Sequence, residues 1–479
     1  MPDIDTAIPY PSESQRVEES IGQSAMSHGQ TQLHSNSHSH LGESTTKVGF
    51  NVLNTIIGSG IVCLPYALHN AGFIFGIIML VAIAALSQFS LYALIVTGKR
   101  TNTAHFSSVT QASLGQTGYH LLNASMVIDM VGTVILYLML VGDLITALTD
   151  IYLPVPTSRS TVIMVVSVVC VLPMLFFRNT GPLARLSIVS ILCLPYIILA
   201  VAFRAPLYAN GNGNDNGNGD GGSGSIRTDL SFFGPRVLPA MGVLAFTYSS
   251  CHAAFPNYLG LRNQTVRSWV HATSWASAGA GLISTAFAVV GYLSFGQASN
   301  ANILNNFPAT DGYINFGRFL FAITLILTIP MAFYPIRDTI TEMLCIDPQR
   351  HGVSRVPESI CTVAVFLTCA LAAASYTDLG LAYELIGTLS SSVVNFLLPA
   401  LIYLWAGTAV SFKGLARSAF VSKDILATES QESLPLLLKH DQNYIYGFGQ
   451  ILLWLTAWTV AGFGFWVMVL GTYNIGRGF

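Results

Sequence analysis

The stretch that decides the fold is NTIIGSGIVCLPYA, residues 54–67. It lies inside an apolar run long enough to cross a bilayer, yet it contains the small-residue triplet Gly58–Gly60, followed by Pro65. Glycine and proline are the poorest helix formers, and backbone groups left unpaired in lipid are costly. A broken helix at this depth is tolerated only where it is buried in protein or lines a water-filled cavity.

The composition around this stretch is that of a membrane protein. Of the 479 residues, 52% are hydrophobic and only 9% are charged, whereas about 25% of the residues of a soluble globular protein are charged. Apolar runs recur along the chain, each near the roughly 20 residues that a spanning helix needs. We therefore expect an all-α membrane protein. The formal net charge of −2 gives no sign of a nucleic-acid partner.

Eleven apolar spans are predicted, and together they form one transmembrane domain, residues 46–471. A polar segment, residues 1–45, precedes this domain and is expected to be a disordered cytosolic tail. A flexible loop rich in Gly and Asn, residues 205–235, and a polar loop, residues 408–443, interrupt the domain. The predicted spans are 46–69, 72–97, 119–148, 160–178, 183–204, 236–259, 268–293, 315–343, 359–376, 380–406 and 444–470.

The positions of lysine and arginine predict the orientation of these spans. With the N-terminus in the cytosol, the inner segments carry 15 of the 21 basic residues and the outer segments carry 6. Cytosolic loops of membrane proteins carry such an excess. The N-terminus is thus predicted inside and the C-terminus outside, which requires an odd number of spans.

The sixth span repeats the pattern of the first. It reads AFTYSSCHAAFPNYLG, with the small-residue cluster Ser249–Cys251 followed by Pro256. Two spans that are broken alike and lie five helices apart are typical of transporters built from five-plus-five inverted repeats. The alternative is a surface of small residues for close helix packing. Close helix packing explains a single span of this kind as well as a broken helix does. The matching pattern in two spans favours broken helices that form a binding site.

The stretch FNVLNTIIGSGIVCLPYALHNAG, residues 50–72, resembles the first helix of the sodium-coupled neutral amino acid transporters, part of the amino acid/auxin permease group. The eighth span, GRFLFAITLILTIPMAFYPIRDTI (residues 317–340), and residues 178–179 after the fourth span carry the resemblance further. It covers nearly all of residues 46–470. The resemblance implies an eleven-helix form of the LeuT-like 5+5 inverted repeat, with discontinuous helices 1 and 6.

An unwound stretch frees N–H groups at one half-helix end and C=O groups at the other, so it can hold a carboxylate and a cation. We expect the substrate carboxylate at the amides of Gly58–Gly60, and its amino group near Phe246 and Ser249. Phe246 and Tyr248 are candidate pocket walls, although simple packing is the commoner role of an aromatic residue. The candidate substrate-binding residues are Thr55, Gly58, Ser59, Gly60, Phe246, Ser249 and Ser250.

The resemblance also implies a cation site. Asn54 stands where the family has an asparagine implicated in sodium and substrate handling, and Thr328 matches a threonine implicated in sodium binding. In LeuT-like geometry the carbonyls of Asn54 and Ile57 face the hydroxyl of Thr328 across one Na⁺. Thr324, one turn earlier, is a further candidate. From the residues alone, both threonines are expected to hydrogen-bond the carbonyl four residues earlier.

Four ionisable residues lie within or beside predicted spans, where such groups are costly and mark functional sites by default. Asp129 and Asp143 lie in the third span and Glu384 in the tenth. Structural ion pairs near helix ends explain Asp143 and Glu384 as well. His252, beside the sixth-span cluster, is either a source of pH dependence or a hydrogen-bonded structural histidine.

These patterns predict a secondary active transporter of neutral amino acids that works by alternating access. The coupling ion is Na⁺, favoured by Thr328, or H⁺, and no other cofactor is expected. The chain has no Walker A motif and no His, Asp or Glu cluster typical of a membrane enzyme, so it is not expected to be an enzyme. The alternative is an amino acid sensor that signals through its cytosolic tail.

The sequence also predicts an integral membrane protein that binds a small-molecule amino acid substrate. It is expected to bind no nucleic acid and to act as a monomer. The membrane is the plasma membrane or the vacuolar or lysosomal membrane. The short sequence ESLPLL, residues 432–437, fits an acidic dileucine sorting pattern that favours the second choice.

Overall fold

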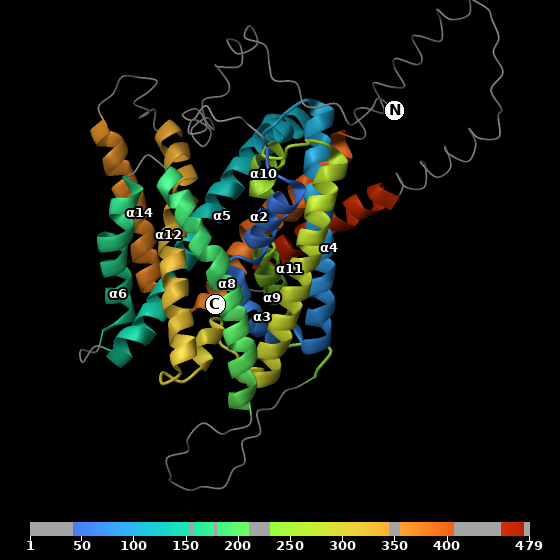
Figure 1. The fold of residues 1–479 in the computed structure, drawn as a ribbon. Helices are drawn as coiled ribbons and strands as arrows, with labels where there is room; N and C mark the ends of the chain where they lie inside the picture. The colour runs from blue at the N-terminus through green and yellow to red at the C-terminus, as the bar shows by residue number, and fades with distance from the viewer. Residues whose placement is uncertain are drawn as a thin grey trace, which may run out of the picture.

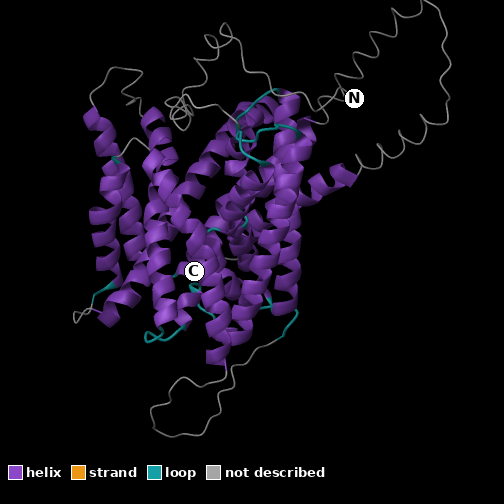
Figure 2. Cartoon of the chain, in the orientation of Figure 1, coloured by secondary structure: helices purple, strands orange, loops and turns teal. Residues whose placement is uncertain are grey.

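The structure is a computed structural model that describes residues 42–152, 157–176, 180–209, 230–343, 355–406 and 452–473. Most of the predicted N-tail and of the loop 205–235 lies outside these ranges, as do the loop 408–443 with its ESLPLL sequence and residues 178–179. The described residues form helices joined by loops, with an isolated β-bridge between Glu43 and Leu261 (Figure 2).

The helices form a bundle in which most of them lie roughly along one common direction (Figure 1). In chain order they are α2 (Thr45–Ile57), η2 (Ser59–Cys63), α3 (Leu64–Ala71), α4 (Phe73–Thr101), α5 (Phe106–Tyr152), α6 (Arg159–Val166), η3 (Ser167–Val171), α7 (Leu172–Leu175), α8 (Thr180–Ala209), α9 (Val237–Thr247), η4 (Cys251–Ala253), α10 (Ala254–Leu259), α11 (Val266–Phe295), η5 (Gly296–Ala298), η6 (Ile303–Asn306), α12 (Gly312–Met343), α14 (Arg355–Ser375), α15 (Leu379–Ile386), η7 (Gly387–Ser391), η8 (Val393–Leu397) and η9 (Val467–Gly471).

Within the described ranges, eight helical segments are long and apolar enough to cross a membrane. Three shorter apolar helices, Arg159–Leu175, Cys193–Tyr208 and Ser359–Ser375, accompany them. These shorter helices overlap the predicted spans 160–178, 183–204 and 359–376. The chain is therefore a helical protein that passes through the membrane several times.

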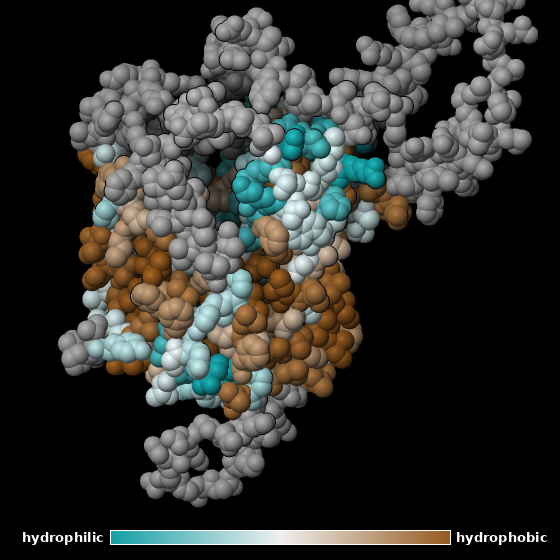
Figure 3. Space-filling view, viewed as in Figure 1, coloured by the Kyte–Doolittle hydropathy of each residue, from teal (hydrophilic) through white to brown (hydrophobic). Residues whose placement is uncertain are grey.

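The outer surface of the bundle is suited to lipid. Large apolar side chains stand exposed along its flanks, and Figure 3 shows them as a broad brown area below a more polar end. A soluble monomer rarely exposes apolar patches of this extent. Examples that are more than half exposed include Phe203, Leu282, Ile360, Val81 and Trp458.

The first predicted break is present in the structure. α2 ends at Ile57, and Gly58 adopts φ +32° and ψ −155°, a conformation that residues with a side chain rarely take. The chain then passes through the 3₁₀ turn η2 into α3, which carries Pro65 in its first turn, where a missing N–H costs nothing. We call residues 58–63 the first break.

The sixth predicted span is interrupted in the same way. α9 ends at Thr247, residues 248–250 are not helical, and the short turn η4 leads into α10. We call residues 248–253 the second break.

Backbone hydrogen bonds join these two interrupted helices at both of their ends. At one end Glu43 N–H donates to the Gly260 carbonyl (2.8 Å), next to the start of α2 and the end of α10. At the other end Arg236 N–H donates to the Asn70 carbonyl (3.0 Å), next to the end of α3 and the start of α9. The two interrupted helices therefore run antiparallel through the middle of the bundle (Figure 1).

Candidate substrate and ion site

The first break touches the other interrupted helix, at the last residue of α9. A Cβ atom added to Gly60 would lie 2.7 Å from Thr247 Oγ1 and 3.0 Å from Thr247 Cα, closer than real Cβ contacts allow. Only a residue without a side chain lets the first break lie so close to the last turn of α9. The Tyr383 hydroxyl of α15 donates to the Ser59 carbonyl (3.3 Å), so a third element also reaches the first break.

One side chain holds the second break in place. Asn395 in η8 accepts hydrogen bonds at its Oδ1 from the backbone N–H groups of Ser250 (2.9 Å) and Cys251 (3.0 Å). Its Nδ2 donates to Ser249 Oγ (2.8 Å). Asn395 is 1% exposed, so these bonds form away from solvent. The helix interruption leaves backbone donors unpaired, and here a side chain pairs two of them.

The sequence analysis missed Asn395. The only signal was an asparagine in an apolar span shortly after three consecutive serines, residues 390–392. Its role depends on the shape of the helix that carries it. That helix widens into two π-helical turns, η7 and η8. Such turns are rare and frequently occur at functional sites.

The π-helical turn η7 also reaches the buried carboxylate of Asp129. The Ser390 hydroxyl donates to Asp129 Oδ1 (2.9 Å), and so does the Ser391 hydroxyl (2.6 Å). Asp129 lies in α5 and is 2% exposed. The Ser249 hydroxyl lies near the same carboxylate, which also interacts electrostatically with His252. The structure thus brings Asp129 and His252, noted separately in the sequence, together at the second break.

The other two ionisable residues form structural ion pairs. Asp143 pairs with Arg159 (2.5 Å), which also donates to the Tyr376 carbonyl (3.0 Å). Glu384 pairs with Arg236 at the start of α9 (2.8 Å) and accepts a hydrogen bond from the Tyr66 hydroxyl of α3 (3.3 Å). The second set ties α3, α9 and α15 together at one end of the interrupted helices.

Most of the predicted substrate-binding residues lie at the two breaks. Ser59 and Gly60 belong to the first break and Ser249 and Ser250 to the second. Phe246 is buried and packs edge-on against the ring of Tyr383, with 5.3 Å between ring centroids.

Two neighbouring residues have other contacts. The Thr55 hydroxyl donates to the Asn51 carbonyl one turn earlier (2.8 Å). Tyr248 is fully buried, and its hydroxyl lies beside Ser284 of α11. Tyr248 therefore packs in the core, which was the alternative to its role as a pocket wall.

The predicted cation ligands occupy two separate helices. The Thr328 hydroxyl of α12 donates to the Thr324 carbonyl (2.7 Å), and the Asn54 carbonyl of α2 accepts the Gly58 N–H (3.1 Å). Each of these oxygens retains a lone pair for an ion. Among the described residues, no hydrogen bond joins Thr328 to Asn54 or Ile57, and no group of three His, Cys, Asp or Glu residues forms a metal site.

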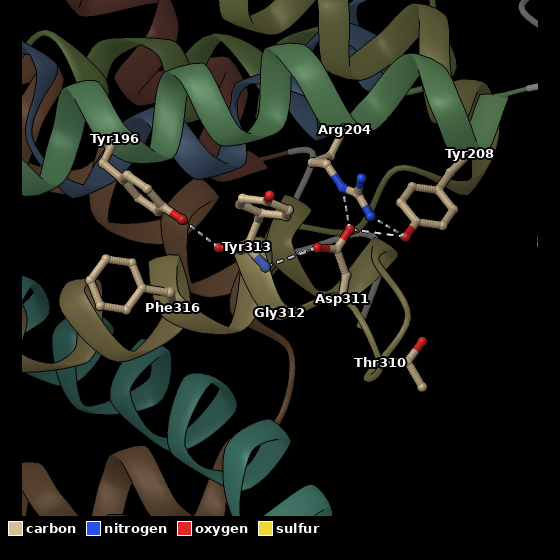
Figure 4. Close-up of a pocket in the computed structure, with 8 residues that line it drawn as sticks. All are labelled: Tyr196, Arg204, Tyr208, Thr310, Asp311, Gly312, Tyr313 and Phe316. Carbon is tan, nitrogen blue, oxygen red and sulfur yellow. Dashed lines mark hydrogen bonds and ion pairs between the residues drawn. The ribbon is translucent and has the colours of Figure 1, made fainter.

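A separate open cavity of about 620 Å³ lies between α8 and the start of α12 (Figure 4). In it Arg204 Nε pairs with Asp311 Oδ2 (2.7 Å), and the Tyr208 hydroxyl donates to the same oxygen (2.9 Å). Burial alone would raise the pKa of Asp311, but the hydrogen bonds from Arg204 and Tyr208 hold it below its ordinary value. The charges compensate each other, so this cavity offers no unmatched charge to a ligand. It is lined by Tyr196, Arg204, Tyr208, Thr310, Asp311, Gly312, Tyr313 and Phe316.

Interrupted helices that meet inside a multi-pass bundle, with polar groups gathered at the breaks, are the site architecture of secondary transporters. The chain matches the family described as transmembrane amino acid transporter protein over residues 42–425, and it belongs to that family. Members of this family are amino acid transporters and not enzymes, and the protein is therefore an amino acid transporter.

Individual relatives have matching names. A protein of Rattus norvegicus, provisionally named sodium-coupled neutral amino acid transporter 11, is 29% identical over 77% of this chain and 79% of its own length. Vacuolar amino acid transporter 2 of Saccharomyces cerevisiae is 23% identical over 74% and 75% of the two chains. Vacuolar amino acid transporter 5 of Schizosaccharomyces pombe is 24% identical over 77% and 87%.

Proposed function

We propose that this protein is a secondary active transporter that moves neutral amino acids by alternating access, coupled to Na⁺ or H⁺. One observation carries the proposal: two interrupted helices run antiparallel, and Gly60 of the first break packs against Thr247, the residue just before the second break. The name of the rat relative favours neutral amino acids and sodium, and the yeast relatives are named for the vacuole.

The proposed architecture is eleven spans arranged as a LeuT-like 5+5 inverted repeat. Eight long and three shorter apolar helices among the described residues support this proposed number, if each shorter helix also crosses the membrane. The antiparallel pairing of the first and sixth crossings supports an inverted relation between the two halves. With the N-terminus in the cytosol, α2 and α10 approach the inner side, while α3 and the start of α9 approach the outer side.

The proposed substrate site lies between the breaks. The substrate carboxylate binds at the backbone of Gly58–Gly60, because an N–H cluster at a half-helix start attracts negative charge. The substrate amino group binds near the hydroxyls of Ser249 and Ser250. Phe246 shapes the space for the side chain of a neutral amino acid. Asn395 positions the second break, and it does not need to touch the substrate.

The proposed sodium site uses hard oxygen ligands, namely the carbonyls of Asn54 and Ile57 and the hydroxyl of Thr328, with Thr324 one turn away. Sodium ions that couple transport bind at unwound backbone carbonyls in such folds. The ion site and the substrate site share the first break, so occupancy of one affects the geometry of the other.

The pattern of burial supports an inward-open state. Asn54, Thr55 and Gly58 are partly exposed, whereas residues 61–64 are fully buried. On the far side of the first break, Arg236 and Tyr66 donate hydrogen bonds to Glu384 and so hold α9 and α3 against α15. In the proposed orientation, the site therefore faces the cytosol.

The test is uptake by the purified full-length chain in proteoliposomes, with a panel of labelled amino acids. A sodium gradient, a choline control and a proton gradient are compared. Concentrative uptake of neutral amino acids with either cation supports the proposal. Tight amino acid binding without any flux would instead favour the sensor, an alternative to which the transporter relatives give no support. The proposed location is the vacuolar, lysosomal or plasma membrane, and the proposed unit is a monomer.

A further inference from the structure

Asp129 is a buried carboxylate that pairs with no lysine or arginine among the described residues. Its hydrogen-bond partners there are the hydroxyl groups of Ser390 and Ser391. Asp143 and Glu384, by contrast, each have an arginine. A buried carboxylate that lacks a lysine or arginine partner is costly as an anion, so a proton or a mobile cation neutralises it readily.

The second break carries the imidazole of His252, which interacts electrostatically with this carboxylate. His252 follows Cys251, whose N–H donates to Asn395. Asn395 in turn donates to the carbonyl of Ser391, a partner of Asp129. The Nδ1 atom of His252 is buried and has no hydrogen-bond partner in the described residues. The residue as a whole is half-buried, whereas Asp129 is 2% exposed. His252 is therefore more accessible to water than the carboxylate is. An imidazole in that position can take a proton from water and pass it inward.

The surroundings contain few other ionisable groups. Tyr137, two turns further along α5, interacts electrostatically with Asp129. Cys251 of the second break is buried beside Asn395. The elements that pack around Asp129, namely η7, η8 and the second break, otherwise present hydroxyl and amide groups. A proton added here is held by Asp129 or His252.

We propose that Asp129 and His252 form a proton-coupling site, which takes up and releases one proton in each transport cycle. The proton comes from water on one side through His252 and leaves to water on the other side after the protein changes conformation. This inference rests on the proposed transport function and adds a proton to it.

The coupling follows from where the pair lies. The Ser391 hydroxyl donates to Asp129, and the Ser391 carbonyl accepts a hydrogen bond from Asn395 Nδ2 (2.9 Å). Asn395 in turn accepts the N–H groups of Ser250 and Cys251. A change of charge on Asp129 alters the hydrogen bond from Ser391, and through Asn395 the second break. Proton binding and the conformation of the proposed substrate site are thereby linked, as thermodynamic coupling requires.

The experiment uses full-length protein in liposomes that enclose a pH-sensitive dye. An amino acid that the wild type exchanges between the two sides is first identified by counterflow. Net flux of that amino acid should then change the lumenal pH. In Asp129→Asn, counterflow should persist while the proton flux falls by about tenfold or more, because the amide cannot be protonated at these pH values. His252→Gln should reduce the proton flux as well.

Asp378→Asn is the matched control. Asp378 caps α15 by accepting the Leu381 N–H (3.0 Å), and asparagine caps equally well. This variant should keep both counterflow and proton flux. If Asp129→Asn loses counterflow too, Asp129→Glu decides, because it retains a titratable group: its flux should show a shifted pH dependence.

The outcomes separate the two proposals. Wild-type amino acid flux without any change of lumenal pH overturns the proton site and leaves the transporter proposal standing. So does undiminished proton flux in Asp129→Asn, or an unshifted pH dependence in Asp129→Glu. Absence of both flux and counterflow for every amino acid in the wild type overturns the transport function itself.

Discussion

At the scale of single residues, Asn395 determines the shape of the second break. Its side chain pairs two backbone N–H groups and one hydroxyl within the buried interior. Each buried donor that loses its partner costs about 1–3 kcal/mol. The residue therefore acts on the site by fixing backbone rather than by contacting a ligand.

We predict that Asn395→Ala lowers the unfolding temperature and greatly reduces amino acid uptake. The reason is that the N–H groups of Ser250 and Cys251 lose their acceptor. Thermal unfolding in detergent and uptake per folded molecule measure the two effects. The control is Asn257→Ala, which removes one half-buried bond to the Ala253 carbonyl (2.9 Å). Equal behaviour of the two variants would remove the proposed role of Asn395.

Gly60 gives a second prediction at this scale. In Gly60→Ala the new Cβ would meet Thr247 at 2.7 Å and 3.0 Å, so the first break and the end of α9 must move apart. Overpacking of this kind costs about 1–3 kcal/mol, and uptake should fall strongly. Gly462→Ala is the control, since nothing lies within 4 Å of its added Cβ. Normal uptake by Gly60→Ala would show that the contact between the first break and α9 is dispensable.

The proposed sodium ligands give a third prediction at the scale of single residues. Thr328→Ala should raise the sodium concentration needed for half-maximal uptake by about tenfold or more, because it removes a hard oxygen ligand. Thr368→Ala is a matched control: its hydroxyl also donates to the carbonyl four residues earlier (2.8 Å), but it is exposed on α14. An unchanged sodium dependence in Thr328→Ala, together with Asn54→Ala, would eliminate the site.

The residues differ in how far the sequence could predict them. Gly58 and Gly60 were predictable, because glycine in a spanning helix signals backbone that must bend or approach closely. The role of Asn395 was not, because its partners lie more than 140 residues away in the chain. The link between Asp129 and His252 was missed for the same reason: each was noted alone, and only the fold brings them together.

At the scale of helices, the predicted spans match observed helices wherever those are described, and they differ at the ends and in regularity. α5 begins at Phe106, well before the predicted start at 119, because its first turns are polar and carry no apolar signal. A kink at Gly115, with φ +71°, lies within that extension. The π-helical turns η7 and η8 were also not predicted, since a local widening of a helix leaves the apolar pattern of a fully buried span unchanged.

The pair Arg204–Asp311 links two helices, α8 and α12, and gives a pH-dependent prediction. A carboxylate whose folded-state pKa is lowered stabilises the fold above its ordinary pKa of about 3.9, and this contribution is lost only as the pH falls through the lower folded value. Between about pH 7 and pH 5 the pair should therefore contribute fully to wild-type stability.

Arg204→Gln should behave differently. Without the arginine, only the hydrogen bonds from Tyr208 and the Ile314 N–H oppose burial, so the pKa of Asp311 should rise and the carboxylate should lose its stabilising effect at neutral pH. The unfolding temperature of the variant should lie below that of the wild type at neutral pH. Acidification should reduce this difference in unfolding temperature. Lys47→Gln, which breaks the exposed pair with Glu43 (2.6 Å), is the control and should change little. A difference that is independent of pH would contradict this account.

At the scale of the whole molecule, the proposed orientation gives a further prediction. A glycosylation acceptor inserted into residues 210–229 should be modified when the protein is made in a eukaryotic cell, because that loop is proposed to lie outside. The same acceptor inserted into residues 408–443 should stay unmodified. A mobility shift that is removed by a glycosidase measures modification. The reverse pattern would refute the cytosolic N-terminus and the odd number of crossings.

The backbone bonds at the ends of the interrupted helices also have a mechanical consequence. Glu43 is tied to Gly260 and Arg262, which clamps α2 to the end of α10. Gly234 and Arg236 are tied to Ala71 and Asn70, which clamps α3 to the start of α9. Each pair of backbone hydrogen bonds joins two half-helices so that they are expected to move together as one rigid unit. The breaks are the points at which the two units can bend relative to each other. A force applied to the chain just before Glu43 is therefore transmitted to α10 as directly as to α2.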